Sequence, residues 1–343
     1  MRKRILLITV FIILLLLQCI KENITEPEPE PGRRDYTWTI DTINSFNPVY
    51  RIWGSSPSDV WAISRGSLTQ DIFHYNGSEW STDGKFRLLS PFSIWGFSES
   101  NIYIGSDEGK IWHYDGNDWK FRVSLTKDGH SDIVFDNMWG DTPTNLYATG
   151  AYPDEWGYAN NSVIAHFNGS EWIMQDTKKI TGIVEYLYMN KSDHLIYFQA
   201  IKLSNTYDST FIYKYEKEKY SELFRTRWTD TWAGLSHING EVYFILKNDI
   251  AVRKNNQFES ILKLENYNFN RKIWGRHSMD IFILMTDGLA HYNGDNIVYL
   301  FYFNNPRTQI FRAAIFDKEV FFLVDESPTG LSLIYHGKLN LAE

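Results

Sequence analysis

The sequence predicts an all-β protein made of repeated four-stranded units, and three observations support this. An aromatic-glycine pair recurs at Trp53, Trp95 and Trp139, with spacings of 42 and 44 residues. Each pair is followed by a short run rich in β-branched and aromatic residues, which favour strands. An Asn-Gly or Asp-Gly pair, a strong signal for a tight hairpin, then precedes another Trp. A period in the forties with several short strands per unit is typical of the blades of a β-propeller.

The first unit shows how the strands are expected to follow one another. Gly54 is expected to end the first strand, because glycine adopts a positive φ at no steric cost. Asp59 comes five residues later, the same interval as in three further copies, and is expected to bond its own backbone in a turn. The four strands of this unit are expected to begin at Ile52, Val60, Ile72 and Trp80.

Seven units are recognised, and we predict seven blades, with six or eight as the alternatives. The seventh unit lacks a fourth strand before the chain ends at Glu343, whereas 36–40 forms a strand-like run with no earlier partner. We therefore expect this run to complete blade seven, with Trp38 in the place that Trp80 has in blade one. Joining the two ends removes the open sheet edges. The units begin near residues 52, 94, 138, 186, 232, 273 and 311.

Length, charge and composition agree with one large domain. The 308 residues from Tyr36 onward divide into seven units of 44, and an aromatic content of 16% suits packing between blades. The net charge is −8, and it falls to −11 without the three cations near the N-terminus. This balance argues against a nucleic-acid partner, which needs clustered Lys and Arg. We expect a monomer without a cofactor.

The first 18 residues are typical of a signal peptide. A basic run at 2–4 precedes an apolar run at 5–17, which is too short to span a membrane comfortably. The sequence Leu-Leu-Gln-Cys that ends at Cys19 resembles the lipobox of bacterial lipoproteins, in which the cysteine is lipidated after cleavage. An uncleaved anchor and an ordinary signal peptide are the alternatives.

Residues 19–35 are expected to be a tether that leads from the lipidated Cys19 to the propeller at 36–343. Alternating Pro and Glu at 26–31 favours an extended, solvated chain. Ile20 after the cysteine resembles the sorting pattern for an outer membrane. We therefore expect a location in the bacterial cell envelope, anchored by lipid.

One histidine recurs at the same place in four units. Such a ring could bind metal, but equivalent positions in successive blades are spread too widely for ligands to converge on one ion. We interpret these histidines as structural, with hydrogen bonds between blades, and predict no metal site. They are His74, His113, His166 and His291.

No catalytic motif is recognised. The Asn/Asp-Gly-x-x-Trp turn resembles part of the Asp-box of sialidase-type propellers, where that motif is structural. The sequence has no Gly-rich phosphate loop, His-Glu-x-x-His helix or Gly-x-Ser-x-Gly elbow. Pairs of carboxylates, which glycoside hydrolysis requires, are inevitable among 42 acidic residues, and nothing singles out one pair.

Loop length gives the first candidate site. In a propeller, the loops that join the second strand to the third and one blade to the next emerge on one face. Long loops on a rigid scaffold often carry function, and they cluster here in blades three and four. Exposed Trp, Tyr and acids suit carbohydrate stacking or a protein hot spot, although neutral loop drift is the alternative. The candidate ligand-binding residues are Asp128, His130, Asp132, Asp154, Glu155, Trp156, Tyr158 and Tyr207.

Polar residues near the start of the first strands give a second candidate site. These side chains could point into the central funnel, where concave polar sites form in such folds. A solvated channel lining is the alternative. They are Arg51, Asn137, Asp230, Lys272 and Arg312.

Residues 36–340 as a whole resemble bacterial secreted and lipid-anchored β-propellers with these repeats, related in outline to kelch and Asp-box propellers. The resemblance implies the fold but not the function, since propellers include both enzymes and binders. We expect a non-enzymatic envelope protein that engages a protein or a glycan by its loop face. A glycan-processing enzyme of hydrolase or lyase type, with its site in the funnel, is the alternative. A purely structural lipoprotein is a third possibility.

Overall fold

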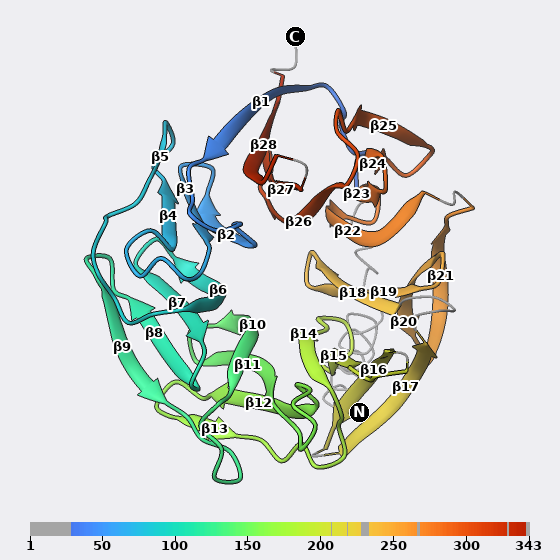
Figure 1. Ribbon diagram of the computed structural model, residues 1–343. Helices are drawn as coiled ribbons and strands as arrows, with labels where there is room; N and C mark the ends of the chain where they lie inside the picture. The colour runs from blue at the N-terminus through green and yellow to red at the C-terminus, as the bar shows by residue number, and fades with distance from the viewer. Residues whose placement is uncertain are drawn as a thin grey trace, which may run out of the picture. The chain divides into compact units, whose positions relative to one another are not determined.

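The computed structural model describes residues 29–206, 208–217, 219–227, 233–265, 268–327 and 329–340. The unit from Pro31 to Glu343 consists of seven four-stranded antiparallel sheets arranged as the blades of a ring (Figure 1). No helix occurs among the described residues. The fold is a β-propeller, and the prediction of seven blades is confirmed.

Blades one to three are continuous in the chain, and each runs from its innermost to its outermost strand. Blade one comprises β2 (Arg51–Ser56), β3 (Asp59–Ile63), β4 (Ile72–Tyr75) and β5 (Trp80–Ser81). Blade two comprises β6 (Pro91–Ser98), β7 (Asn101–Ser106), β8 (Lys110–Tyr114) and β9 (Trp119–Ser124). Blade three comprises β10 (Val134–Thr142), β11 (Asn145–Tyr152), β12 (Asn161–Phe167) and β13 (Trp172–Met174).

Blades four to six repeat this order, and blade seven takes its outermost strand from the N-terminal side. Blade four comprises β14 (Ile183–Met189), β15 (Ile196–Lys202), β16 (Ser209–Glu216) and β17 (Lys219–Arg227). Blade five comprises β18 (Ala233–Ile238), β19 (Glu241–Leu246), β20 (Asp249–Lys254) and β21 (Gln257–Lys263). Blade six comprises β22 (Phe269–His277), β23 (Asp280–Met285), β24 (Gly288–Tyr292) and β25 (Ile297–Tyr302). Blade seven comprises β26 (Thr308–Ile315), β27 (Glu319–Glu326), β28 (Leu331–Leu339) and β1 (Tyr36–Ile43).

The ring closes as the sequence predicts, because β1 pairs antiparallel with β28. Trp38 lies opposite Gly337, one residue after His336, just as Trp80 lies opposite Tyr75, one residue after His74. The chain is also fixed just before β1. The Gly32 amide donates to the carbonyl of Met279 in blade six, at 2.8 Å.

The hydrophobic core consists of layers between neighbouring blades. Buried side chains form seven clusters within the described residues, and each cluster joins two adjacent blades. Phe321 and Leu323 of blade seven, for example, pack with Val60 and Tyr75 of blade one. Each large apolar side chain that is fully buried contributes about 1.5–3 kcal/mol. These layers make the ring a rigid frame for the loops and the central channel.

The glycine of the Trp-Gly pair has a different role from the one expected. Gly54, Gly96 and Gly140 lie inside their strands, and none has a positive φ. A Cβ at Gly96 would lie 2.5 Å from the Trp53 ring of the preceding blade. A Cβ at Gly140 would likewise lie 2.8 Å from the Phe97 ring. These glycines therefore provide space for an aromatic ring of the neighbouring blade, and the expected strand end is wrong.

The repeated histidines are structural, but their hydrogen bonds lie within a blade rather than between blades. The Nε2 atom of His74 lies 2.7 Å from Oδ1 of Asp59, and that of His291 lies 2.6 Å from Oδ1 of Asp280. Asn101 and Asn145 accept from the corresponding histidines at 2.8 Å. The Asp or Asn that begins the second strand thus holds the third-strand histidine, instead of bonding its own turn as predicted.

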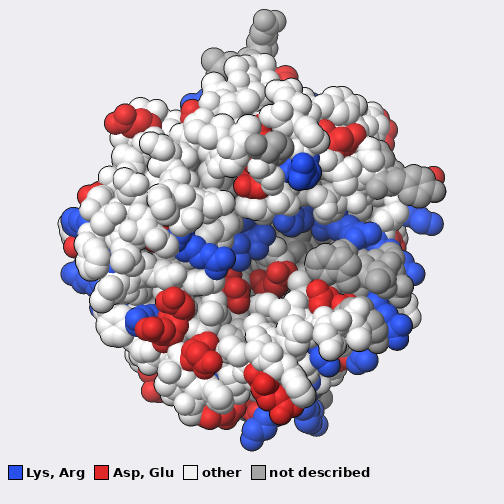
Figure 2. Space-filling view, viewed as in Figure 1, with Lys and Arg blue, Asp and Glu red and all other residues white. Residues whose placement is uncertain are grey.

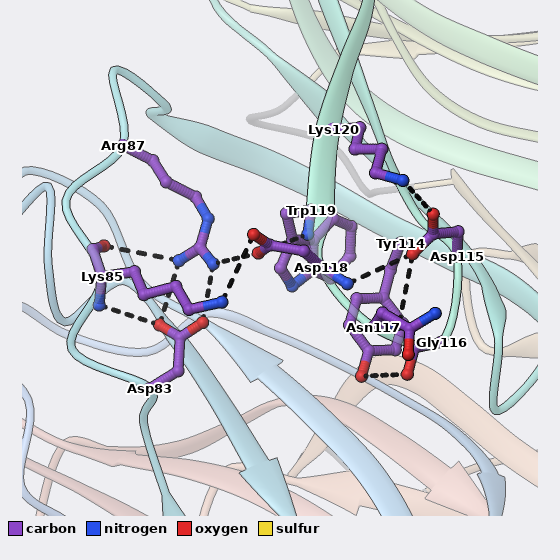
Figure 3. Close-up of polar contacts among 10 residues, drawn as sticks. All are labelled: Asp83, Lys85, Arg87, Tyr114, Asp115, Gly116, Asn117, Asp118, Trp119 and Lys120. Atoms are coloured by element: carbon purple, nitrogen blue, oxygen red, sulfur yellow. Dashed lines mark hydrogen bonds and ion pairs between the residues drawn. The ribbon is translucent and has the colours of Figure 1, made fainter.

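The hairpin between the third and fourth strands is built as its sequence predicts and also joins adjacent blades (Figure 3). Asp115 Oδ1 accepts from the amides of Asn117 and Asp118 at 3.2 Å, and Gly116 has a φ of 90°. Asp118 then accepts from Arg87 of the blade one–two connection at 2.7 Å. Arg87 also binds Asp83 with both terminal nitrogens, at 3.0 and 2.6 Å. This network fixes the outer edge of blade two.

Candidate functional site

The long loops of blades three and four surround a cavity of about 850 Å³. It is lined by the β11–β12 loop at 153–160, the β15–β16 loop from residue 203, the β9–β10 turn, and the β13–β14 connection. We call it the loop cavity. Its volume is in the range of sites for small ligands, about 300–1,000 Å³.

The β11–β12 loop is held in one conformation by the carboxylate of Asp154. Its Oδ1 accepts from the amides of Trp156 and Tyr158, both at 2.9 Å. Its Oδ2 accepts from the Asn160 side chain at 2.8 Å. Desolvation opposes ionisation, but these hydrogen bonds outweigh it and hold the pKa of Asp154 below its ordinary value. Asp154 therefore builds the loop, and its acceptor atoms are largely occupied.

Asn160 joins the loop of blade three to that of blade four. Its side-chain nitrogen donates to the carbonyl of Leu203 at 3.0 Å, and its oxygen accepts from the Leu203 amide at 2.9 Å. Its own carbonyl accepts from Gly182 of the β13–β14 connection at 2.8 Å. Only 8% of Asn160 is exposed, so these bonds are shielded from water. Asn160 was not predicted from the sequence, because its partners lie in two distant segments.

The β9–β10 turn forms the remaining wall. Lys127 is buried and has no carboxylate partner within the described ranges. Its ammonium donates to the carbonyls of Gln175 and Ser162 at 3.0 and 3.3 Å and also to Thr177. Burial lowers the pKa of Lys127. The His130 ring stacks on Tyr152 with a centroid distance of 4.4 Å. This turn is therefore packed onto blade three.

The structure brings most of the predicted loop residues together. Asp128, Asp154, Glu155, Trp156 and Tyr158 line the loop cavity. His130 lies beside it on Tyr152, and Asp132 lies 3.6 Å from His130. Tyr207 is outside the described residues. Trp156 is 76% exposed, and it has no side-chain partner among the described contacts.

A second cavity, of about 700 Å³, occupies the centre of the ring and is lined by the innermost strands. Arg51, Asn137, Lys272 and Arg312 line it, as predicted, whereas Asp230 lies outside the described residues. Figure 2 shows Lys and Arg side chains along one side of a central hollow and Asp and Glu side chains opposite. The lining cations come from blades one, six and seven.

Irregular strand pairing positions several of these charged residues. The pairing register of β14 with β15 shifts between Val184 and Tyr186, so Glu185 forms a bulge. Similar shifts precede Arg312 in β26 and include Lys272 in β22. A bulge re-aims a side chain locally, which alters what each blade presents to the channel. The sequence does not mark these bulges, and Glu185 was missed for that reason.

Several charged groups in and beside the central cavity have pKa values that differ from those of exposed groups. Burial, reinforced by Arg312, lowers the pKa of Lys272 to about 7, and burial lowers that of Arg51 to about 10. Burial raises the pKa of Asp136 in β10 to about 6, and Glu185 adds to this shift. Perturbed values of this kind cluster at functional sites.

Two features are absent from the residues that the structure describes. No group of three or more His, Cys, Asp or Glu side chains is placed to hold a metal ion there. Within the same residues, no helix has the length and apolarity needed to cross a membrane. Cys19 and residues 1–28 lie outside them, so the predicted lipidation and signal peptide have no structural counterpart here.

Comparison with solved structures finds proteins of similar fold at low sequence identity. YCF48 bound to a D1 peptide matches with a TM-score of 0.60 at 13% identity, over 90% of this chain and 99% of that one. YCF48 from Cyanidioschyzon merolae matches with a TM-score of 0.58 at 11% identity, over 87% and 98%.

An extracellular domain gives a further match. It belongs to a B. thetaiotaomicron protein assigned as a one-component system, with a TM-score of 0.57 at 14% identity over 86% of this chain. The match covers only 39% of the chain in that structure. No family model matches the sequence, and no curated protein matches it. These likenesses establish the class, a seven-bladed β-propeller, and do not assign an activity.

Proposed function

We propose that this chain is a non-enzymatic binding module of the bacterial cell envelope, which engages a protein or a glycan through the loops of blades three and four. The observation that carries this proposal is the position of Trp156. It is 76% exposed, yet the loop that bears it is fixed by Asp154 and Asn160 at the rim of the loop cavity. An aromatic side chain on a pre-organised loop loses little conformational entropy on binding.

The comparisons support a binding role for a fold of this shape. One similar structure, YCF48, contains a bound D1 peptide, and another is an extracellular domain. For this chain, the mixed lining of the loop cavity suits a polar ligand with an apolar or ring-shaped part. Asp128, Glu155 and Lys202 provide charge, and Trp156 and Tyr158 provide flat apolar surface.

The loop site is tested by truncating its exposed aromatic. Trp156→Ala should weaken capture of the ligand by about 2 kcal/mol, roughly thirtyfold in Kd, as for a typical hot spot. The melting temperature should stay unchanged because the side chain packs against little. Phe46→Ala, which removes another exposed aromatic (79%), is the matched control. Equal capture by wild type and Trp156→Ala would reject this site.

Two assays on the same protein distinguish a carbohydrate ligand from a protein ligand. A glycan array reports a carbohydrate, and a photoreactive amino acid at position 156 crosslinks a protein in the envelope. A panel of glycosides tests the enzymatic alternative. Turnover that is lost in Asp136→Asn would favour that alternative, whereas binding without turnover supports the binding module.

The anchor is a separate part of the proposal. We propose that Cys19 carries the lipid and that the Pro/Glu run keeps the propeller away from the membrane. The expected result is incorporation of labelled fatty acid into the wild-type chain and none into Cys19→Ala. Equal labelling of both chains would exclude lipidation at Cys19.

A further inference from the structure

The central cavity concentrates positive charge that has no ionic partner among the described residues. Arg51 of β2, Lys272 of β22 and Arg312 of β26 belong to blades one, six and seven, which are neighbours in the ring. Ion pairs within 4.0 Å occur in many places among the described residues, but none involves these three cations. Their charge is therefore not neutralised by contact with a carboxylate of the described chain.

The hydrogen bonds of the two arginines leave donors free. Arg51 donates to the backbone carbonyls of Asp136 and Tyr50 at 2.9 and 3.2 Å, and its buried Nε has no partner in the part of the chain that the structure describes. Arg312 donates to the carbonyl of Phe311 at 2.9 Å and lies over the Tyr186 ring at 5.0 Å. An arginine stacked on an aromatic ring has a fixed orientation, and its remaining N–H groups form a fork that fits a carboxylate.

These cations are costly to the folded protein. Moving a cation out of water without a paired anion destabilises the folded protein. The lowered pKa of Lys272 reflects this cost, because burial, Arg312 and Arg51 all disfavour its charged form and Glu185 only partly opposes them. A bound anion would compensate all three cations at once.

The opposite wall limits which anion fits. Glu185 of blade four lines the same cavity, and Asp136 of blade three lies close enough to affect Arg51. Negative charge on that side repels a second anionic group, so polyanions are disfavoured. Aromatic side chains complete the lining, among them Tyr186, Tyr188 and Trp274. The cavity therefore suits one anionic group attached to an uncharged body.

We propose that the central cavity binds a small monoanionic ligand through its carboxylate, with Arg51 and Arg312 as forked donors and Lys272 as the third cation. The uncharged body of the ligand, the size of a sugar or an amino acid, packs on Tyr186 and Tyr188. This site is separate from the loop cavity, so a test of one site does not decide the other.

The experiment is calorimetric titration of the full chain with matched pairs of probes. One pair is methyl glucuronide and methyl glucoside, and the other is N-acetylphenylalanine and its amide. Binding of either acid, at least tenfold tighter than its neutral counterpart, supports the proposal, and the pair that responds identifies the source of the carboxylate. Equal binding of acid and neutral forms overturns it. Binding of inorganic phosphate alone, or of no probe, also overturns it.

Two variants distinguish a binding role from a structural one. Arg312→Gln and Lys272→Met should each weaken binding of the acid at least tenfold. Their melting temperatures should equal or exceed that of the wild type, since each removes an uncompensated cation. Lys254→Gln removes a cation on the outer surface of blade five and should change neither property. If both variants fail to fold, Arg312→Lys is the milder variant to test. Unchanged acid binding in Arg312→Lys would overturn the role of Arg312 as a forked donor.

The pH dependence gives an independent readout. The charged or titratable groups that line the cavity with Lys272 are Arg51 of β2, Glu185, Tyr186 and Tyr188 of β14, His237 of β18, Arg271 of β22 and Arg312 of β26. The lowered pKa of His237 and the high pKa of Tyr186 keep both neutral between pH 7 and 9. Affinity for the acid should therefore fall up to about tenfold per pH unit above 7, as Lys272 loses its proton. Lys272→Met should show no such decline, and a flat wild-type profile would exclude Lys272 from the site.

Discussion

The Asp280 site offers a sharp test of how the repeated second-strand acid stabilises a blade. Asp280 is 3% exposed and accepts from His291 Nε2 at 2.6 Å and from Arg276 Nη1 at 2.7 Å. Arg276 in turn donates to Tyr36 of the closing strand at 3.0 Å and to the carbonyl of Phe316 in blade seven at 2.7 Å. Asp280→Asn preserves the shape and one acceptor oxygen but removes the negative charge.

The expected loss follows from the burial of this pair. Removing one partner of a buried ion pair costs about 3–5 kcal/mol. Asn keeps an acceptor for His291, and Arg276 keeps its bonds to Tyr36 and Phe316, so we expect about 3 kcal/mol, the lower end. Desolvation alone would raise the pKa of Asp280, but the hydrogen bonds from His291 and Arg276 outweigh it and lower the pKa.

The sign of the pH effect follows from this lowered pKa. The charge of Asp280 stabilises the folded state above the unfolded-state pKa of about 4, and this contribution disappears as the pH falls through the lower folded-state pKa. Urea denaturation at pH 7 and at several values below 4 measures the difference between wild type and Asp280→Asn. The difference should shrink in acid. Asp295→Asn, at an exposed position, is the control. An unchanged difference at pH 3 would refute the electrostatic explanation.

Three further substitutions test the frame itself. Trp38→Ala removes a ring that packs edge-on against Phe301 at 5.0 Å, and denaturation should show a loss of about 3 kcal/mol, whereas Thr37→Ala on the exposed side should show little. Arg87→Ala breaks the contacts with Asp83 and Asp118 and should lower the melting temperature by several degrees. Arg87→Lys, which keeps the positive charge, should lower it less. Gly150→Ala would place a Cβ 1.9 Å from a backbone oxygen of β10, so the soluble yield should fall sharply, and a normal yield would contradict the register.

The sequence predicts the frame well because each blade repeats the same local chemistry. The hairpin at Asp115 and the opening of the outer strand at Trp119 depend only on neighbouring residues, and both are confirmed. Ring closure is also predictable, because an unpaired strand at one end matches a missing strand at the other. The role of the glycine at Gly96 was not predictable in the same way. Its constraint comes from Trp53 in the preceding blade, and the period alone does not show which side chain fills that space.

The candidate sites are less accessible to sequence reasoning. Loop length located the cavity near Trp156, but not Asn160, whose bonds reach Leu203 and Gly182. In the channel, a position near the start of the first strand predicted Arg51 and Lys272 but not Glu185. A bulge of one residue shifts the side chain that faces inward, and it leaves no reliable mark in the sequence.

The pairing of β1 with β28 has a consequence for biogenesis. The strand β1, which completes blade seven, is made nearly three hundred residues before its partner β28. Contacts so distant in sequence form slowly, because the entropy of closing the loop is lost before pairing compensates it. Until β28 leaves the ribosome, β1 has an open edge that other chains can pair with. The protein can therefore complete blade seven only after β28 has been made, and β1 is exposed to misassembly throughout that interval.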